Sequence, residues 1–314
     1  MIPQSDKARR KIVVVGAGAV GSTTAYTLFL RERATELVLI DVNMDKAKGD
    51  ALDMNHGLPF VGQTSIRASG YEECADADIV IVTAGAAQRP GETRTDLLKR
   101  NLAIFDEILT NVMASGSEAI LLIATNPVDL MTQYSQRVTG WPAHRVIGSG
   151  TLLDSARFRY RISRELGVDP RSVHASIIGE HGDSEVPVWS LANVAGMPVS
   201  LPEERKKEVF VDTRDAAYEI IAAKGATYYA IALALDRICA AILNNEGSVL
   251  NVSAKLDGQY GLNDVYAGVP CVVDRTGVRS ILELPLQPEE LEGLRRSAEK
   301  LTNLARETFP AKRI

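Results

Sequence analysis

The stretch KIVVVGAGAVGSTTAYTLFL, residues 11–30, decides the fold. Its apolar run from Ile12 to Val15 does not alternate with polar residues, as expected for a strand buried on both faces. Glycines follow at Gly16, Gly18 and Gly21, and the next residues have helical length. Strand, glycine-rich turn and helix are the context that the dinucleotide fingerprint requires. The stretch therefore predicts the first βαβ unit of a dinucleotide-binding sheet.

Each glycine of this turn has its own physical reason. Gly16 would permit the tight turn, Gly18 would let backbone amides approach a pyrophosphate, and Gly21 would let helix and strand pack closely. The helix N-terminus adds partial positive charge for a phosphate. The turn is therefore suited to a dinucleotide's phosphates.

A carboxylate at the end of the second predicted strand points to the type of dinucleotide. Asp41 ends the run ELVLID, twenty residues after Gly21, where it can accept hydrogen bonds from ribose hydroxyls. Its charge would repel a 2′-phosphate, and the following residues VNMD contain no arginine, so NAD is favoured over NADP. The alternative is a strand-end aspartate that caps a turn.

Outward from this unit, short β-branched runs alternate with helix-length segments up to Ile147. The runs are KIVVV, ELVLID, DIVIVTAG, AILLIATNP and RVIGSG. This rhythm predicts a doubly wound parallel sheet of the Rossmann type. The strand-end loops at 83–86 and 124–127 should flank the nicotinamide half of the cofactor.

After Gly150 the rhythm changes to mixed α+β. Helices are predicted over 152–167, 213–243 and 288–309, and strands over 173–182, 248–254 and 271–286. We place an NAD-binding Rossmann domain at 1–149 and a substrate-binding, catalytic α+β domain at 150–314. Each is expected to bury its own core, with the active site in the cleft between them.

Composition excludes several classes of protein. The 314 residues are 46% hydrophobic and 24% charged, as in ordinary globular proteins. A net charge of −5 argues against nucleic-acid binding. The three cysteines lie far apart and resemble neither a disulfide framework nor a zinc site, which favours a reducing cytoplasm and no metal. No apolar run is long enough to span a membrane, and none is typical of a signal peptide.

Polar residues with catalytic potential cluster in three segments. The loop QRPGETR carries Arg89 and Arg94, which could also be solvated surface charges. In LLDSARFR, Asp154 and Arg157 share a helix face and Arg159 points roughly the opposite way; the alternative for the first two is a local salt bridge.

The third segment, IIGEHGDSEVP, contributes a histidine. His181 stands between glycines after an apolar run, a poor position for a core histidine and a good one for a side chain facing a cleft. A lone histidine is more often structural, but the other three, His56, His144 and His174, have no such setting.

Together these segments resemble the lactate/malate dehydrogenase family over nearly the whole chain, most closely its bacterial L-lactate-specific members. The motifs, in the family's order, are GAGAVG, Asp41, QRPGETR, TNPVD, LLDSARFR, GEHGDS and KGATYY. The resemblance implies reversible hydride transfer between NADH and a 2-oxo acid. It also implies that the NAD site includes Gly16, Gly18, Val20, Gly21, Asp41, Lys46, Tyr71, Gly85, Ala86, Thr125, Asn126 and Ser149.

The resemblance assigns one catalytic role to each matching position. His181 is the acid/base, and it titrates near neutrality as that role demands. Asp154 orients its imidazole without transferring the proton. Arg157 clamps the substrate carboxylate with two hydrogen bonds, and Arg94 polarises the carbonyl when its loop closes. Asn126 adds a neutral donor, and Thr227 lines the pocket.

Gln88, two residues before Pro90, is the position expected to select the substrate. Lactate-specific members resemble this sequence with glutamine, whereas malate-specific members typically carry arginine for the second carboxylate of oxaloacetate. Burying that carboxylate without a partner would cost several kcal/mol. Pyruvate is therefore the expected substrate, although a register slip could bring Arg89 inward. Malate dehydrogenase activity and a catalytically silent NAD-binding sensor are the rival interpretations.

The resemblance also implies regulation and assembly. Arg159 and His174 match a pair that binds fructose 1,6-bisphosphate between subunits, and the alternative is a solvated arginine and a packed histidine. A homotetramer is implied as well. The chain between His181 and Thr227 is shorter than expected of the family, which leaves the path of residues 195–215 open.

Overall fold

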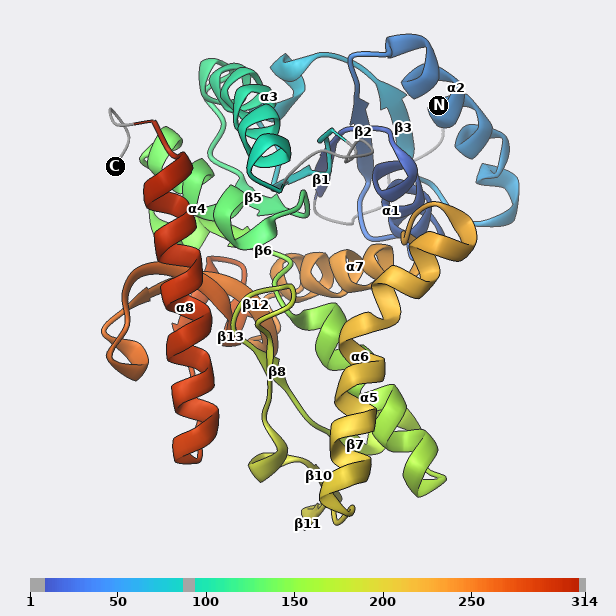
Figure 1. Ribbon diagram of the computed structural model, residues 1–314. Helices are drawn as coiled ribbons and strands as arrows, with labels where there is room; N and C mark the ends of the chain where they lie inside the picture. The colour runs from blue at the N-terminus through green and yellow to red at the C-terminus, as the bar shows by residue number, and fades with distance from the viewer. Residues whose placement is uncertain (1–8, 87–93, 311–314) are drawn as a thin grey trace.

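A computed structural model describes residues 9–86 and 94–310 (Figure 1), without the side chains of residues 94 and 95. Its first half is a parallel sheet in the order β3-β2-β1-β4-β5-β6. The bounds of these strands are β1 (Lys11–Val15), β2 (Glu36–Ile40), β3 (Ser65–Ala68), β4 (Ile79–Val82), β5 (Ile120–Ile123) and β6 (Val146–Gly148). The chain proceeds from β1 outward in one direction and from β4 in the other, so the Rossmann-type sheet is confirmed.

Helices connect these strands and cover the sheet (Figure 1). They are α1 (Ala19–Leu30), α2 (Met44–His56), α3 (Arg94–Ala114) and α4 (Val128–Thr139). The order of strands reverses between β1 and β4, where an open α/β sheet binds its ligands at the carboxyl ends of the strands. The glycine turn after β1 lies at this point. Strand β3 is absent from the pattern predicted from the sequence, because its four residues, SIRA, include an arginine and a serine.

The long strands of the second half do not form a separate sheet. Strands β12 (Ser248–Asp257), β13 (Asn263–Asp274) and β14 (Gly277–Ile281) extend the parallel sheet as antiparallel strands beyond β6, which gives nine strands in all. The join is narrow, because the register pairs Ser253 of β12 with Gly148 of β6.

The remaining elements of the second half are helices and short strands. The helices are α5 (Leu152–Leu166), α6 (Glu203–Lys224), α7 (Tyr229–Leu243) and α8 (Pro288–Thr308), and the strands are β7 (Val173–His174), β8 (Ile177–Ile178), β9 (Val186–Pro187), β10 (Asn193–Val194) and β11 (Met197–Pro198). The predicted helix over 213–243 is two helices, because Gly225 ends α6 with a left-handed φ of 83°. The predicted strand over 173–182 is only the short pieces β7 and β8.

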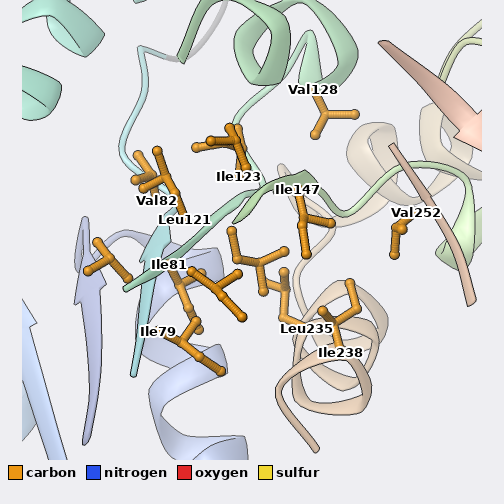
Figure 2. Packing of buried hydrophobic residues seen from close by; sticks show 14 of the residues in the cluster. Ile79, Ile81, Val82, Leu121, Ile123, Val128, Ile147, Leu235, Ile238 and Val252 are labelled. Atoms are coloured by element: carbon orange, nitrogen blue, oxygen red, sulfur yellow. The ribbon is translucent and has the colours of Figure 1, made fainter. Parts of the chain in front are cut away.

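The main hydrophobic core crosses the boundary between the halves, which corrects the expectation of one core for each. Figure 2 shows Ile79 and Leu121 of the parallel sheet in the same cluster as Leu235 and Ile238 of α7 and Val252 of β12. A smaller cluster around Phe158 lies within the second half alone. The continuous core fixes the glycine turn relative to the strands of the second half. Among the described residues, no helix is both long and apolar enough to cross a membrane.

Candidate active site

The glycine turn has two positions closed by packing and one open position. A Cβ at Gly21 would lie 1.7 Å from the carbonyl oxygen of Gly16, so α1 packs directly on the turn. A Cβ at Gly16, where φ is +102°, would lie 2.5 Å from the backbone nitrogen of Ala84. Gly18, the N-cap of α1, has ordinary backbone angles and no atom within 4 Å of its Cβ position. The space beside Gly18 fits a pyrophosphate at the helix N-terminus.

Asp41 lies beside this turn and hydrogen-bonds to it. Its Oδ2 accepts from the backbone nitrogen of Ala17 at 2.6 Å and its Oδ1 from that of Asn43 at 2.8 Å. Lys46 of α2 donates to the carbonyl oxygen of Ala17 and, at 2.7 Å, to Asp50. Asp41 therefore holds the turn, which is the role that the alternative interpretation of a turn-capping aspartate gives it. Its carboxylate is also partly exposed, so it can still contact a ribose.

The loops after β4 and β5 are tied together at the predicted nicotinamide end. Asn101 of α3 accepts a hydrogen bond from the backbone nitrogen of Ala86 at 2.8 Å and donates to the carbonyl oxygen of Asn126 at 2.9 Å. A Cβ at Gly85 would lie 2.5 Å from Cγ2 of Thr125. Asn126 precedes a cis peptide bond to Pro127, and it is exposed. The two loops therefore form one surface.

Three other predicted cofactor residues lie on separate elements of the first half. Val20 lies in the first turn of α1 and is partly buried. Tyr71 begins a short helical turn, where burial raises its pKa to about 12. Ser149 follows β6 and is buried, with its backbone nitrogen bonded to the carbonyl oxygen of Ile123 at 2.8 Å. Of these three, Val20 and Tyr71 retain exposed surface for direct contact with a ligand.

A group of three charged side chains with a buried carboxylate at its centre lies in the second half. Nδ1 of His181 lies 2.5 Å from Oδ2 of Asp154, and Nη1 of Arg157 donates to Oδ1 of Asp154 at 2.8 Å. Asp154 is 3% exposed, whereas the side chains of His181 and Arg157 keep 22% and 13% of their surface. The i,i+3 salt bridge is thus present, and the same carboxylate also binds the histidine. The exposed ring edge can reach a substrate.

The charges around His181 favour its protonated form. Burial disfavours the imidazolium, but the negative charge of Asp154 and its hydrogen bond outweigh burial and raise the pKa of His181 to about 9. Burial acts in the opposite direction on Asp154, and there the positive charges of His181 and Arg157 prevail and lower its pKa. The site therefore holds an imidazolium at neutral pH, and the expected titration of His181 near neutrality is corrected to a higher pH.

Sequence reasoning missed two buried carboxyl groups near His181. Asp129 of α4 accepts the backbone N–H of His181 at 2.8 Å. Glu185 is buried, its Oε1 has no hydrogen-bond partner among the described residues, and burial raises its pKa to about 8. The motif TNPVD contained the signal for Asp129, an acidic residue in the first turn of a helix. No sequence signal marks Glu185 as buried.

The remaining predicted residues are not joined to His181 by a described contact. Gln88 and Arg89 lie outside the described residues, and Arg94 begins α3 with its side chain outside them. Thr227 lies in the turn between α6 and α7 and is partly exposed.

The predicted effector pair lies elsewhere. Arg159 and His174 both line a cavity of about 640 Å³ between α5, α7 and β12. Nε of Arg159 is buried with no hydrogen-bond partner among the described residues, and burial lowers its pKa.

Comparison with known proteins supplies the family. The NAD binding domain of lactate/malate dehydrogenase matches residues 10–148, and the alpha/beta C-terminal domain of the same family matches residues 151–310. The chain belongs to the lactate/malate dehydrogenase family. In this family member the glycine turn falls within the NAD binding domain and His181 within the C-terminal domain.

Relatives of this lactate/malate dehydrogenase family member are similar over almost their full length. An L-lactate dehydrogenase of Macrococcus caseolyticus is 53% identical over 93% of this chain and 95% of its own. One of Staphylococcus epidermidis is 53% identical over 93% and 95%. The crystal structure of the minor L-lactate dehydrogenase of Enterococcus mundtii in its ligands-bound form is 46% identical and covers 96% of this chain and 99% of its own, with a TM-score of 0.94.

Proposed function

We propose that the chain is an NAD-dependent L-lactate dehydrogenase that interconverts pyruvate and (S)-lactate, as the last step of fermentative glycolysis. The observation that carries the proposal is the buried Asp154 carboxylate, which joins His181 to Arg157. A proton donor and a cation for a substrate carboxylate are thereby held together, in a chain with an NAD binding domain. The L-lactate dehydrogenases to which it is similar support the choice of substrate.

The residues divide the reaction between them. NADH, when bound along the glycine turn, supplies the hydride to C2 of pyruvate. Protonated His181 gives its proton to the carbonyl oxygen as the C2–H bond forms, and in the reverse direction the neutral ring accepts the hydroxyl proton of lactate. Asp154 holds the ring and stabilises its charge.

Binding and polarisation fall to other groups. Arg157 would bind the substrate carboxylate through its planar guanidinium, which a lysine could not replace. Asn126 would donate to the carbonyl oxygen beside Arg94, and Thr227 would line the pocket. Gln88 would lie beside the methyl group of pyruvate. In the same place it would offer no cation to the second carboxylate of oxaloacetate.

We place the NAD-binding part at residues 1–149 and the catalytic part at 150–314, and the family matches ending at 148 and starting at 151 support this division. The cofactor residues assigned from the sequence remain a proposal, in which Ser149, whose side chain is buried, would have little exposed surface for NAD. Arg159 and His174 would bind the phosphates of fructose 1,6-bisphosphate, supported by their shared cavity. An activity titration without any response to this compound would contradict that assignment.

Assembly and location complete the proposal. A homotetramer is proposed, and light scattering that reports a monomer would contradict it. The cytoplasm is the proposed location, supported by the three free and buried cysteines, which need no oxidising compartment. Fractionation of cells that make the protein tests this location.

The decisive experiment follows NADH oxidation by the purified protein with pyruvate or oxaloacetate as substrate. We expect a strong preference for pyruvate. A preference for oxaloacetate would retain the hydride transfer but make the protein a malate dehydrogenase, and inactivity with both would favour an NAD-binding sensor.

A further inference from the structure

Asp129 is a buried carboxylate to which the proposed reaction gives no role. It is the second residue of α4 and is 2% exposed. Burial raises the pKa of Asp129 to about 6, partly offset by its hydrogen bonds to Ser253 and His181. Taking a charged group out of water is costly unless it is well hydrogen-bonded. The hydrogen-bond partners of Asp129 should therefore indicate the role of this carboxylate.

Both oxygens of this carboxylate are used, each by a different element. Oδ2 accepts the backbone N–H of His181 at 2.8 Å, and Oδ1 accepts the hydroxyl of Ser253 at 2.6 Å. Ser253 is fully buried on β12, at the point where that strand meets β6. Asp129 therefore links α4, the loop after β8 and the junction of the sheet.

His181 is consequently held at two points by two aspartates. Asp154 contacts the ring at Nδ1, and Asp129 contacts the backbone nitrogen. The preceding backbone nitrogen, that of Glu180, donates to Ser297 of α8 at 2.8 Å. The ring contact sets the orientation of the imidazole, whereas the backbone contacts set where the whole residue stands.

We propose that Asp129 is a positioning residue for the hydride transfer: it fixes the backbone of His181 relative to Asn126. The inference rests on the proposed function, in which both residues act on the same carbonyl oxygen. Asn126 comes three residues before Asp129 on the turn that leads into α4. The same short stretch of chain thus carries Asn126, which donates to the carbonyl, and Asp129, which holds the backbone of His181. The distance between Asn126 and His181 is therefore kept constant.

A carboxylate suits this position better than a neutral side chain. It offers acceptors to two donors at once and has no hydrogen of its own to place. It also contributes a negative charge that raises the pKa of His181. Among the described residues, the charged groups that act on His181 or on the carboxyls beside it are Asp154 and Arg157 of α5, Asp129 of α4, Glu180 and Glu185 of its own loop, and Arg214 of α6.

Three variants of the full-length protein test the proposal. Asp129→Ala removes both hydrogen bonds and is expected to lower kcat about 100-fold, the scale of a misplacement near 1 Å, with NADH affinity unchanged. Asp129→Asn keeps an acceptor for His181 and can donate to the reversible hydroxyl of Ser253, so it should recover most of kcat. Its loss of charge should move the alkaline midpoint of pyruvate reduction to lower pH. Ser253→Ala, the matched control, should retain kcat.

Wild-type activity with pyruvate separates this inference from the proposed function. If the wild type reduces neither pyruvate nor oxaloacetate, the proposed function fails first. With an active wild type, an Asp129→Ala enzyme of normal kcat would overturn the inference. So would a Ser253→Ala enzyme as slow as Asp129→Ala, because the carboxylate would then serve the sheet junction. If circular dichroism shows that Asp129→Ala is unfolded, an unchanged pH midpoint in Asp129→Asn overturns the inference.

Discussion

The cofactor end and the acid–base end of this protein are built in opposite ways. At the cofactor end, backbone atoms approach one another at glycines, and the open space beside Gly18 is left for a ligand. At the acid–base end, charged side chains from α4 and α5 converge on His181. The first depends on local backbone conformation, whereas the second depends on residues far apart in the sequence. Substitutions should therefore affect binding at one end and chemistry at the other.

The largest effect is expected from His181→Gln. Removal of the proton donor should lower kcat for pyruvate reduction about 1,000-fold, within the range of general acid catalysis. Its effect on NADH affinity should be small, because the glycine turn is unchanged. Stopped-flow measurement of NADH oxidation checks the rate, and fluorescence titration checks the affinity. If His181→Gln binds NADH poorly, the acid–base end also contributes to cofactor binding, which contradicts the separation of the two ends.

The second-largest effect is expected from Gly21→Ala, which should lower the stability of the fold. A Cβ 1.7 Å from the carbonyl oxygen of Gly16 requires α1 to move, and we expect about 3 kcal/mol loss in the free energy of unfolding. Denaturant unfolding of the protein without added NADH measures this loss. A Gly21→Ala variant as stable as the wild type would show instead that α1 can shift away from the turn at little cost.

Gly18→Ala is the matched control for Gly21→Ala and has a smaller effect of its own. Its Cβ meets no protein atom within 4 Å, and its backbone angles suit alanine. Stability should change by less than about 0.5 kcal/mol. The added methyl group would occupy the pyrophosphate space, so the Kd for NADH should rise about tenfold, which corresponds to about 1.4 kcal/mol. Unchanged Kd would remove Gly18 from the cofactor site.

The smallest effect concerns pH. The pKa of His181 is raised to about 9, so its protonated form predominates at neutral pH and is lost as pH rises through 9. The kcat/KM for pyruvate should therefore be level below this value and fall above it. Asp154→Asn removes the largest charge that opposes the effect of burial on His181, and the midpoint should move to lower pH. A pH–rate profile of both proteins checks this, and an identical midpoint would contradict the assigned charge interaction.

Sequence reasoning predicted the cofactor end better than the acid–base end for a physical reason. The spacing of Gly16, Gly18 and Gly21 directly encodes the turn, and their context after a buried strand is local. The strand of four residues over 65–68 escaped prediction because a short edge strand needs little apolar character. The extension of the sheet by β12 also escaped, because pairing between distant strands leaves no periodic signal.

At the acid–base end the resemblance indicated that Asp154 orients the ring of His181, but nothing in the sequence showed what holds the backbone of His181. Helix spacing placed Asp154 beside Arg157, and the structure shows that salt bridge. Asp129 and Ser253 are 124 residues apart in sequence, so nothing local revealed that they meet behind His181. Burial of Glu185 arises in the same way from packing between distant segments. Such contacts follow only from the fold.

One side-by-side measurement tests the central claim that binding and chemistry reside at separate ends. The Kd for NADH and the single-turnover rate of pyruvate reduction at saturating NADH are determined for wild type, Gly18→Ala and His181→Gln. We predict that Gly18→Ala weakens NADH binding while its saturated rate stays near wild type, and that His181→Gln abolishes turnover while its NADH binding stays normal. If both quantities fall together in both variants, the two ends are not separable and the account is wrong.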